Sequence, residues 1–183
     1  TEEDRSGLPD FLLAAAEEAA RERGLNGKHV ITLSRSSIEP FLQFSSNRAL
    51  REEAFKAWSA RGENGGDTDN RAIVAETIGL RAEKAKLLGF DTFADFKLDD
   101  TMAKTPQAVR DLLMKVWQPA VIRAAEEEAK LADMARSEGG NFKIAPWDWR
   151  YYSEKVRKAE HDLDEAEIKP YLAAAPAGLA HPL

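Results

Sequence analysis

Along most of this chain, apolar residues recur at intervals of three or four, which is the spacing of one face of a helix. Proline in a first helical turn and glycine directly after a last apolar position mark where several of these stretches begin and end. Together these signals predict helices over about residues 8–23, 47–61, 70–88, 90–96, 105–137 and 147–159.

Two features interrupt this helical pattern. Residues 29–33 and 41–45 are short β-favouring runs separated by a polar loop that contains Pro40, and this arrangement predicts a β-hairpin. Pro119 lies inside the longest helical stretch, where a proline removes a backbone donor and crowds the preceding turn. We therefore expect one short hairpin near residues 29–45 and a long helix that is kinked or divided near Gln118.

The composition supports a mainly helical fold and narrows the class of protein. The chain has 183 residues, and its 30 Ala and 18 Leu outnumber its 13 β-branched Val and Ile. A net charge of −6 without a clustered basic face argues against nucleic acid as a partner, and no apolar run is long enough to span a membrane. The absence of cysteine suits a reducing compartment, so we expect an all-α cytoplasmic protein with one short hairpin.

The three histidines are the natural place to look for a metal site in a chain without cysteine. The metallopeptidase motif HExxH is absent, because Val30, Asp162 and Pro182 follow the three histidines. His161 has acidic neighbours, and we interpret them, like the glutamates at 126–128, as a solvated helical face. The sequence therefore predicts no catalytic residue and no metal ligand in this chain.

The densest unusual segment is residues 147–152, with four aromatics around one acid and one base. One interpretation is the wall of a cleft that holds a peptide. The other is a helix N-terminus capped by Asp148 with its aromatics packed in a core, and the residue types favour it. The candidates for contact with substrate are Trp147, Asp148, Arg150, Tyr151 and Tyr152.

Several segments in order resemble the zinc oligopeptidase family of thimet oligopeptidase, oligopeptidase A and the bacterial peptidyl-dipeptidases. They are GLPDFLLAAAEEAARERG, HVITLSRSSIEPFLQFSSNRALREEAFKAWSARGENGGDTDNRAI, LRAEKAKLLGF, TMAKTPQAV and PWDWRYYSEKVRKAEHDLDEAEIKPYL. They extend over residues 7–172, and the last is the most specific. The segments VITL, SNRALRE, RGENGG, LLGF and WDWRYY are closest to the peptidyl-dipeptidase (dipeptidyl carboxypeptidase) branch.

This resemblance implies a large all-helical zinc peptidase whose deep channel admits only short unstructured peptides. In the family, the HExxH helix and the other catalytic residues lie C-terminal to the region matched here. The resemblance therefore implies that residues 1–172 are one helical segment of the peptidase's helical lobe, with zinc and the catalytic lobe elsewhere in the polypeptide. The alternative is a non-catalytic helical module, derived from that family, that binds peptides or proteins.

The end of the chain departs from the family pattern. Residues 173–183 form a low-complexity tail where the family continues into another helix. We interpret this tail as a frameshifted or expression-derived end, or as a natural truncation. A segment without its usual partner lobe is expected to expose apolar surface and to self-associate.

Overall fold

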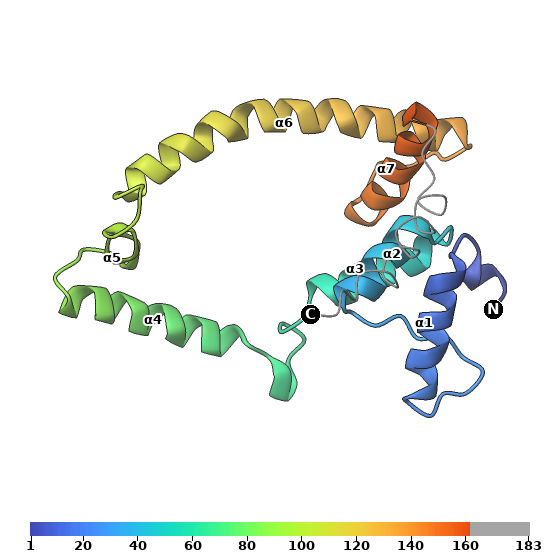
Figure 1. The fold of residues 1–183 in the computed structure, drawn as a ribbon, viewed down its shortest axis with the longest axis horizontal. Helices are drawn as coiled ribbons and strands as arrows, with labels where there is room; N and C mark the ends of the chain where they lie inside the picture. Colours follow the sequence, from blue (N-terminus) through green and yellow to red (C-terminus); the bar gives the residue numbers. More distant parts are fainter. Residues whose placement is uncertain (162–183) are drawn as a thin grey trace, which may run out of the picture. The chain divides into compact units, whose positions relative to one another are not determined.

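The computed structural model describes residues 1–161, and every regular element in that range is a helix (Figure 1). The all-α class is therefore confirmed, while the predicted tail at 173–183 lies outside the described residues. In this described range, two short 3-10 helices accompany seven α-helices. They are η1 (Glu3–Arg5), α1 (Asp10–Arg21), α2 (Arg35–Phe44), α3 (Arg48–Ser59), η2 (Gly66–Thr68), α4 (Arg71–Leu87), α5 (Phe93–Leu98), α6 (Pro106–Ser137) and α7 (Pro146–His161).

Helix boundaries follow the local signals in the sequence. The Thr105 hydroxyl accepts a hydrogen bond from the Ala108 N–H at 3.2 Å, directly before the first residue of α6. Thr92 and Asp95 form a reciprocal capping box that begins α5. Gly89 follows α4 with a φ of +83°, a left-handed conformation that glycine adopts without strain. These three boundaries explain why the predicted and observed helices agree within a few residues.

The predicted β-hairpin at 29–45 is wrong, because residues 35–44 form α2. Ile38, Phe41 and Leu42 are its buried residues, and their spacing is helical. The preceding run is extended but pairs with no strand: the Val30 N–H donates to the Ala16 carbonyl of α1 at 2.9 Å. A hydrogen bond to α1 thus takes the place of strand pairing in a run whose composition favours a strand.

Pro119 does not divide the long helix, and α6 continues from Pro106 to Ser137. A proline removes one N–H donor and crowds the carbonyl four residues earlier, here that of Lys115. The helical turns on both sides keep their own hydrogen bonds, so the disturbance stays local. None of the helices within residues 1–161 is long and apolar enough to cross a membrane.

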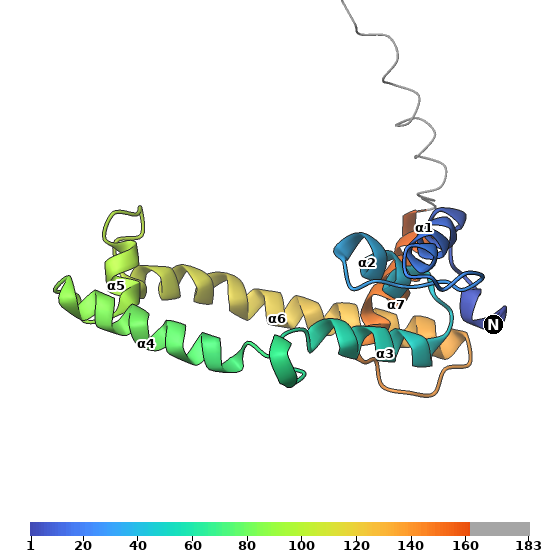
Figure 2. The same cartoon turned by 90° about the horizontal axis from the view of Figure 1, so that it is seen from below.

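The chain divides into two compact units, of which the first contains residues 1–55 and 128 onwards. Within this unit α2 packs against both α1 and α7, as the two views show (Figures 1 and 2). The buried apolar residues on α1 and α2 are Leu12, Ala16, Ala20, Ile38, Phe41 and Leu42. A second cluster joins the end of α6 to α7 and contains Leu131, Ala135, Ile144 and Tyr152.

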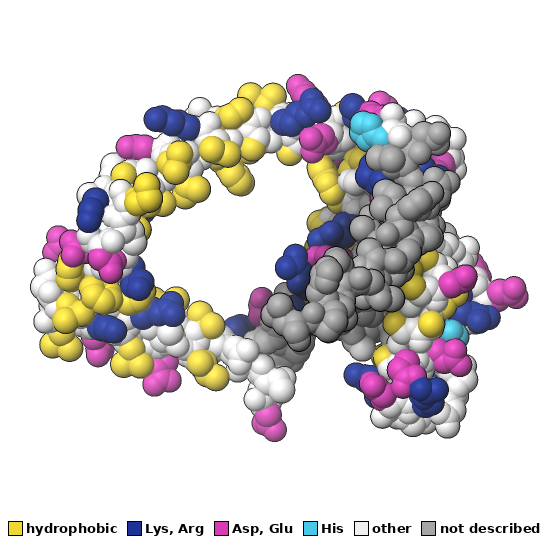
Figure 3. Space-filling model, viewed as in Figure 1, with side chains coloured by type: hydrophobic (Ala, Val, Ile, Leu, Met, Phe, Trp, Pro, Cys, Tyr) yellow, Lys and Arg dark blue, Asp and Glu magenta, His cyan; other side chains and the backbone are white. Residues whose placement is uncertain are grey.

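The second unit, residues 56–127, has almost no core of its own. Its helix α4 packs against α5, and Ala85 is its single buried apolar residue within the described range. Apolar side chains instead lie on the surface of α4 and of the first part of α6 (Figure 3). These exposed residues include Ile73, Val74, Ile78, Leu80, Leu87, Leu112, Leu113, Val116, Trp117 and Ile122.

Candidate functional site

The segment singled out in the sequence forms the first turn of α7. Pro146 occupies the first helical position, where its missing N–H costs no hydrogen bond. Asp148 then folds back: its Oδ2 accepts a hydrogen bond from the Ala145 N–H at 3.1 Å, and its own N–H donates to the Ala145 carbonyl at 2.9 Å. Asp148 therefore caps the start of α7, as the structural interpretation predicts.

The Asp148 carboxylate is fully buried and binds a cation from α3. Arg48 Nε donates to Oδ1 at 3.0 Å and to Oδ2 at 3.1 Å, and a terminal nitrogen of Arg48 donates to Oδ2 at 2.8 Å. These hydrogen bonds raise the pKa of Arg48 above its ordinary value. The guanidinium also lies over the Phe142 ring, 4.3 Å from its centroid.

A second arginine of α3, Arg51, is buried against the same carboxylate. It donates to Asp148 Oδ1 at 3.0 Å, to the Ser45 carbonyl at 2.7 Å and to the Trp147 carbonyl at 3.2 Å. Each of its three guanidinium nitrogens therefore has an acceptor, which a buried arginine requires. The Tyr151 ring covers the guanidinium at 4.0 Å. Two arginines of α3 thus hold the first turn of α7 in place.

The next turn of α7 continues this packing. Lys155 donates to Glu138 at 2.6 Å and lies 4.7 Å from the centre of the Tyr151 ring. Burial acts to lower the pKa of Lys155. The hydrogen bonds of Lys155 to Glu138 and Tyr151 outweigh this effect of burial, so the pKa is raised. Burial also raises the pKa of Tyr152, which lies in the core cluster. Both side chains therefore keep their protons in the folded state.

The five sequence candidates do not line one surface. Asp148 and Tyr152 are buried, and Trp147 and Tyr151 are partly buried and contact the two arginines of α3. Arg150 is the exposed member, and it forms an ion pair with Glu39 of α2 at 3.1 Å. The structure thus brings four of the five together as packing around α3.

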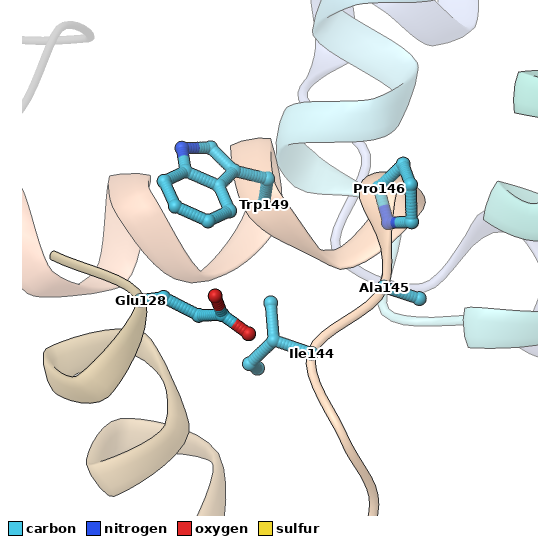
Figure 4. A pocket seen from close by; sticks show the side chains of 5 residues that line it. All are labelled: Glu128, Ile144, Ala145, Pro146 and Trp149. Atoms are coloured by element: carbon cyan, nitrogen blue, oxygen red, sulfur yellow. The ribbon is translucent and has the colours of Figure 1, made fainter. Parts of the chain in front are cut away.

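An open pocket of about 420 Å³ lies beside this packing, between α6 and the start of α7 (Figure 4). Its lining combines apolar groups with one carboxylate, that of Glu128. Neither Glu128 nor Trp149 is among the candidates predicted from the sequence, although Trp149 belongs to residues 147–152. The lining residues are Glu128, Ile144, Ala145, Pro146 and Trp149.

Comparison with known families now identifies the chain. The family model described as Peptidase family M3 matches residues 41–178, which include all of α2 beyond Pro40, α3 to α7 and the arginine and aspartate positions described above. The chain belongs to peptidase family M3. The predicted resemblance to oligopeptidases is therefore confirmed.

Several M3 peptidases are similar to almost the whole chain. A dipeptidyl carboxypeptidase of Escherichia coli is 40% identical over 166 residues, which cover 91% of this chain and 24% of that protein. Oligopeptidase A of Haemophilus influenzae is 37% identical, over 93% of this chain and 25% of that protein. A probable cytosolic oligopeptidase A of Arabidopsis thaliana is 35% identical, with coverage of 91% and 25%. The chain thus spans about a quarter of the length of these relatives.

M3 peptidases are zinc-dependent, and a zinc site needs several His, Cys, Asp or Glu ligands close together. Within residues 1–161, no three His, Cys, Asp or Glu side chains lie close enough together to hold an ion. His29 precedes α2, and His161 is the last residue of α7. The described residues therefore do not fit a zinc site, and the buried Asp148 serves arginine side chains instead.

Proposed function

We propose that this chain forms a non-catalytic part of an M3 oligopeptidase that hydrolyses short peptides in the cytoplasm. The observation that carries the proposal is the 40% identity over 91% of the chain to a dipeptidyl carboxypeptidase. In this proposal the catalytic zinc binds elsewhere in the peptidase, beyond the quarter of the polypeptide that is matched. The chain supplies rigid helices that line the path of the peptide.

The contacts of Asp148 with two arginines support a structural role for the aromatic segment, residues 147–152. Asp148 binds Arg48 and Arg51, so its carboxylate holds α7 against α3. A carboxylate in this state has no lone pair aimed at solvent with which to bind a peptide. Trp147, Tyr151 and Tyr152 therefore act as packing behind the proposed peptide path, and Arg150 is the candidate that a peptide can reach.

The exposed apolar side chains of residues 56–127 support a further part of the proposal. A surface patch of this kind marks an interface with another polypeptide surface. In the complete peptidase, we propose that the remaining polypeptide covers it. When the chain is purified alone, a second copy is the available partner, because a two-fold axis brings the same patch of both copies together.

The exposed patch also favours the alternative function, a helical module that binds a partner protein without any peptidase activity. Fluorescence anisotropy of labelled short peptides distinguishes the two functions. The proposal predicts saturable binding of unstructured peptides that folded proteins do not displace. Binding of a folded protein with no measurable binding of peptides would overturn the peptidase proposal and support the module.

A further inference from the structure

The open pocket between α6 and α7 combines an indole, three aliphatic residues and one carboxylate. Trp149 and Pro146 come from the first turn of α7, Ile144 and Ala145 from the segment before it, and Glu128 from α6. Figure 4 shows the Glu128 carboxylate turned toward Ile144, across the pocket from the Trp149 indole. A group in this space therefore meets both an apolar lining and the carboxylate.

Within residues 1–161, Glu128 differs from the two glutamates before it in having no cationic partner. Arg123 binds Glu126 at 2.9 Å and Glu127 at 3.3 Å. No hydrogen bond or ion pair joins the Glu128 carboxylate to any residue in the described range, 1–161. It is also partly buried, unlike the two glutamates before it. No cation in this part of the chain therefore neutralises its charge, and the side chain is not fully hydrated.

The sequence explains why this carboxylate has no partner on its own helix. Side chains three or four positions apart are neighbours on a helix, and an arginine or lysine at such a position would bind Glu128. Here those positions are all apolar, so the helix presents the carboxylate with no competing cation. They are Ala124, Ala125, Leu131 and Ala132.

We propose that this pocket binds the side chain of a lysine or arginine of a peptide. The aliphatic stem would pack on Ile144 and Pro146, and the charged end would contact the Glu128 carboxylate and the face of the Trp149 indole. The site deepens the proposed function and rests on it, because it assigns a basic residue to the peptide that the oligopeptidase binds.

The chemistry of the lining excludes other ligand classes. An anion would be repelled by Glu128, and a metal ion would find one carboxylate where it needs several ligands. A neutral apolar ligand would bury the carboxylate without compensating its charge. A cation on an aliphatic stem is the class of ligand that satisfies every group in the pocket.

The test uses Nα-acetyl-lysine amide. This compound carries the aliphatic stem and the charge of lysine, but it contains no peptide bond between two amino-acid residues. Its binding is followed by the indole N–H resonances of the four tryptophans in NMR spectra of the full chain. We expect the Trp149 resonance to shift saturably, and Nα-acetyl-norleucine amide, which lacks the charge, to shift it far less. Added salt should weaken the lysine effect.

Two glutamine variants test whether the lysine compound binds at the Glu128 carboxylate. Glu128→Gln should weaken binding about three- to fivefold, as expected for a partly exposed ion pair. Glu127→Gln removes the neighbouring charge on the same helix and should leave the affinity unchanged. Equal responses to lysine and norleucine, or equal affinities of the Glu128→Gln and native chains, would overturn the assignment. Because no hydrolysis or long peptide is involved, this result is independent of the anisotropy test of the proposed function.

Discussion

At Asp148, one buried carboxylate binds two guanidinium groups, so the three charges depend on one another. Arg51 is buried with it, while about a third of the Arg48 side chain (36%) is exposed. Removing one member of such a group leaves the others buried without compensation, which costs more than the intact group contributes. Asp148 therefore matters mainly because its loss would leave cations unpaired.

The variant Asp148→Asn tests this dependence directly. We expect it to lower the free energy of unfolding by about 3–5 kcal/mol, because two arginines lose their counter-charge. Asp133→Asn is the matched control, since Asp133 pairs with Arg136 on the surface of α6 and should cost less than about 1 kcal/mol. Urea denaturation of both variants measures the difference. Similar costs for the two would show that the buried network does not hold α7.

The raised pKa values of Tyr152 and Lys155 predict how the stability of the protein changes at alkaline pH. Their pKa values are raised in the folded state above 10.0 and 10.5, so the folded state keeps protons that the unfolded state releases. Their contribution is complete below pH 10 and is lost as the pH rises through the raised values. We expect these two groups to lower the melting temperature as the pH rises above about 10, and the fall to be smaller in Tyr152→Phe. An unchanged pH dependence in that variant would contradict the role of Tyr152.

At the residue scale, the sequence could indicate local partners but not distant ones. The capping role of Asp148 was predictable, because Ala145 is three positions away. Its arginine partners were not, because Arg48 lies 100 positions earlier and α3 has several charged residues. Glu128 was interpreted as part of a solvated run, and only its position beside Trp149 sets it apart.

At the element scale, the correction of the hairpin to α2 shows where local preference yields to packing. Residues 29–33 favour a strand by composition, yet the Val30 N–H bonds to α1. The spacing of Ile38, Phe41 and Leu42 was a helical signal in the same segment, but Pro40 suggested a loop. Periodicity was therefore the better guide than the presence of one proline.

The turn before α1 offers a test of how closely this turn packs against the end of α2. Gly7 has a φ of +82°, and a Cβ there would overlap the carbonyl oxygen of Phe44 at the end of α2. Gly7→Ala should therefore cost more than the roughly 1–2 kcal/mol of left-handed strain alone. Gly27→Ala is the control, because Gly27 has a φ of +75° with open space around it. Equal melting temperatures for the two variants would contradict this close approach.

At the scale of the whole molecule, the two units differ in how they bury apolar surface. The unit that contains α1, α2 and α7 has a core, whereas residues 56–127 bury Ala85 alone within the described range. The helices of the second unit were predictable from their periodicity. Their exposure was not, because periodicity shows which residues share a face but not what covers that face.

We expect the purified chain to self-associate through this exposed surface. Sedimentation velocity should show a mass that rises with concentration, because association removes apolar side chains from water. Ile122→Glu places a charge on an exposed apolar position of α6 and should shift the equilibrium toward monomer. Gln118→Glu adds the same charge at a polar position of that helix and should have little effect. A native chain that stays monomeric at all concentrations would contradict the expectation.

We propose above all that this M3 chain contributes structure and peptide contacts rather than the chemistry of hydrolysis. The most direct measurement is mass spectrometry of short peptides incubated with the purified chain and added zinc. We expect the peptides to remain intact, because residues 1–161 contain no cluster that can hold the metal and the whole sequence has no HExxH motif. Zinc-dependent cleavage that co-purifies with the chain and stops on chelation would contradict it.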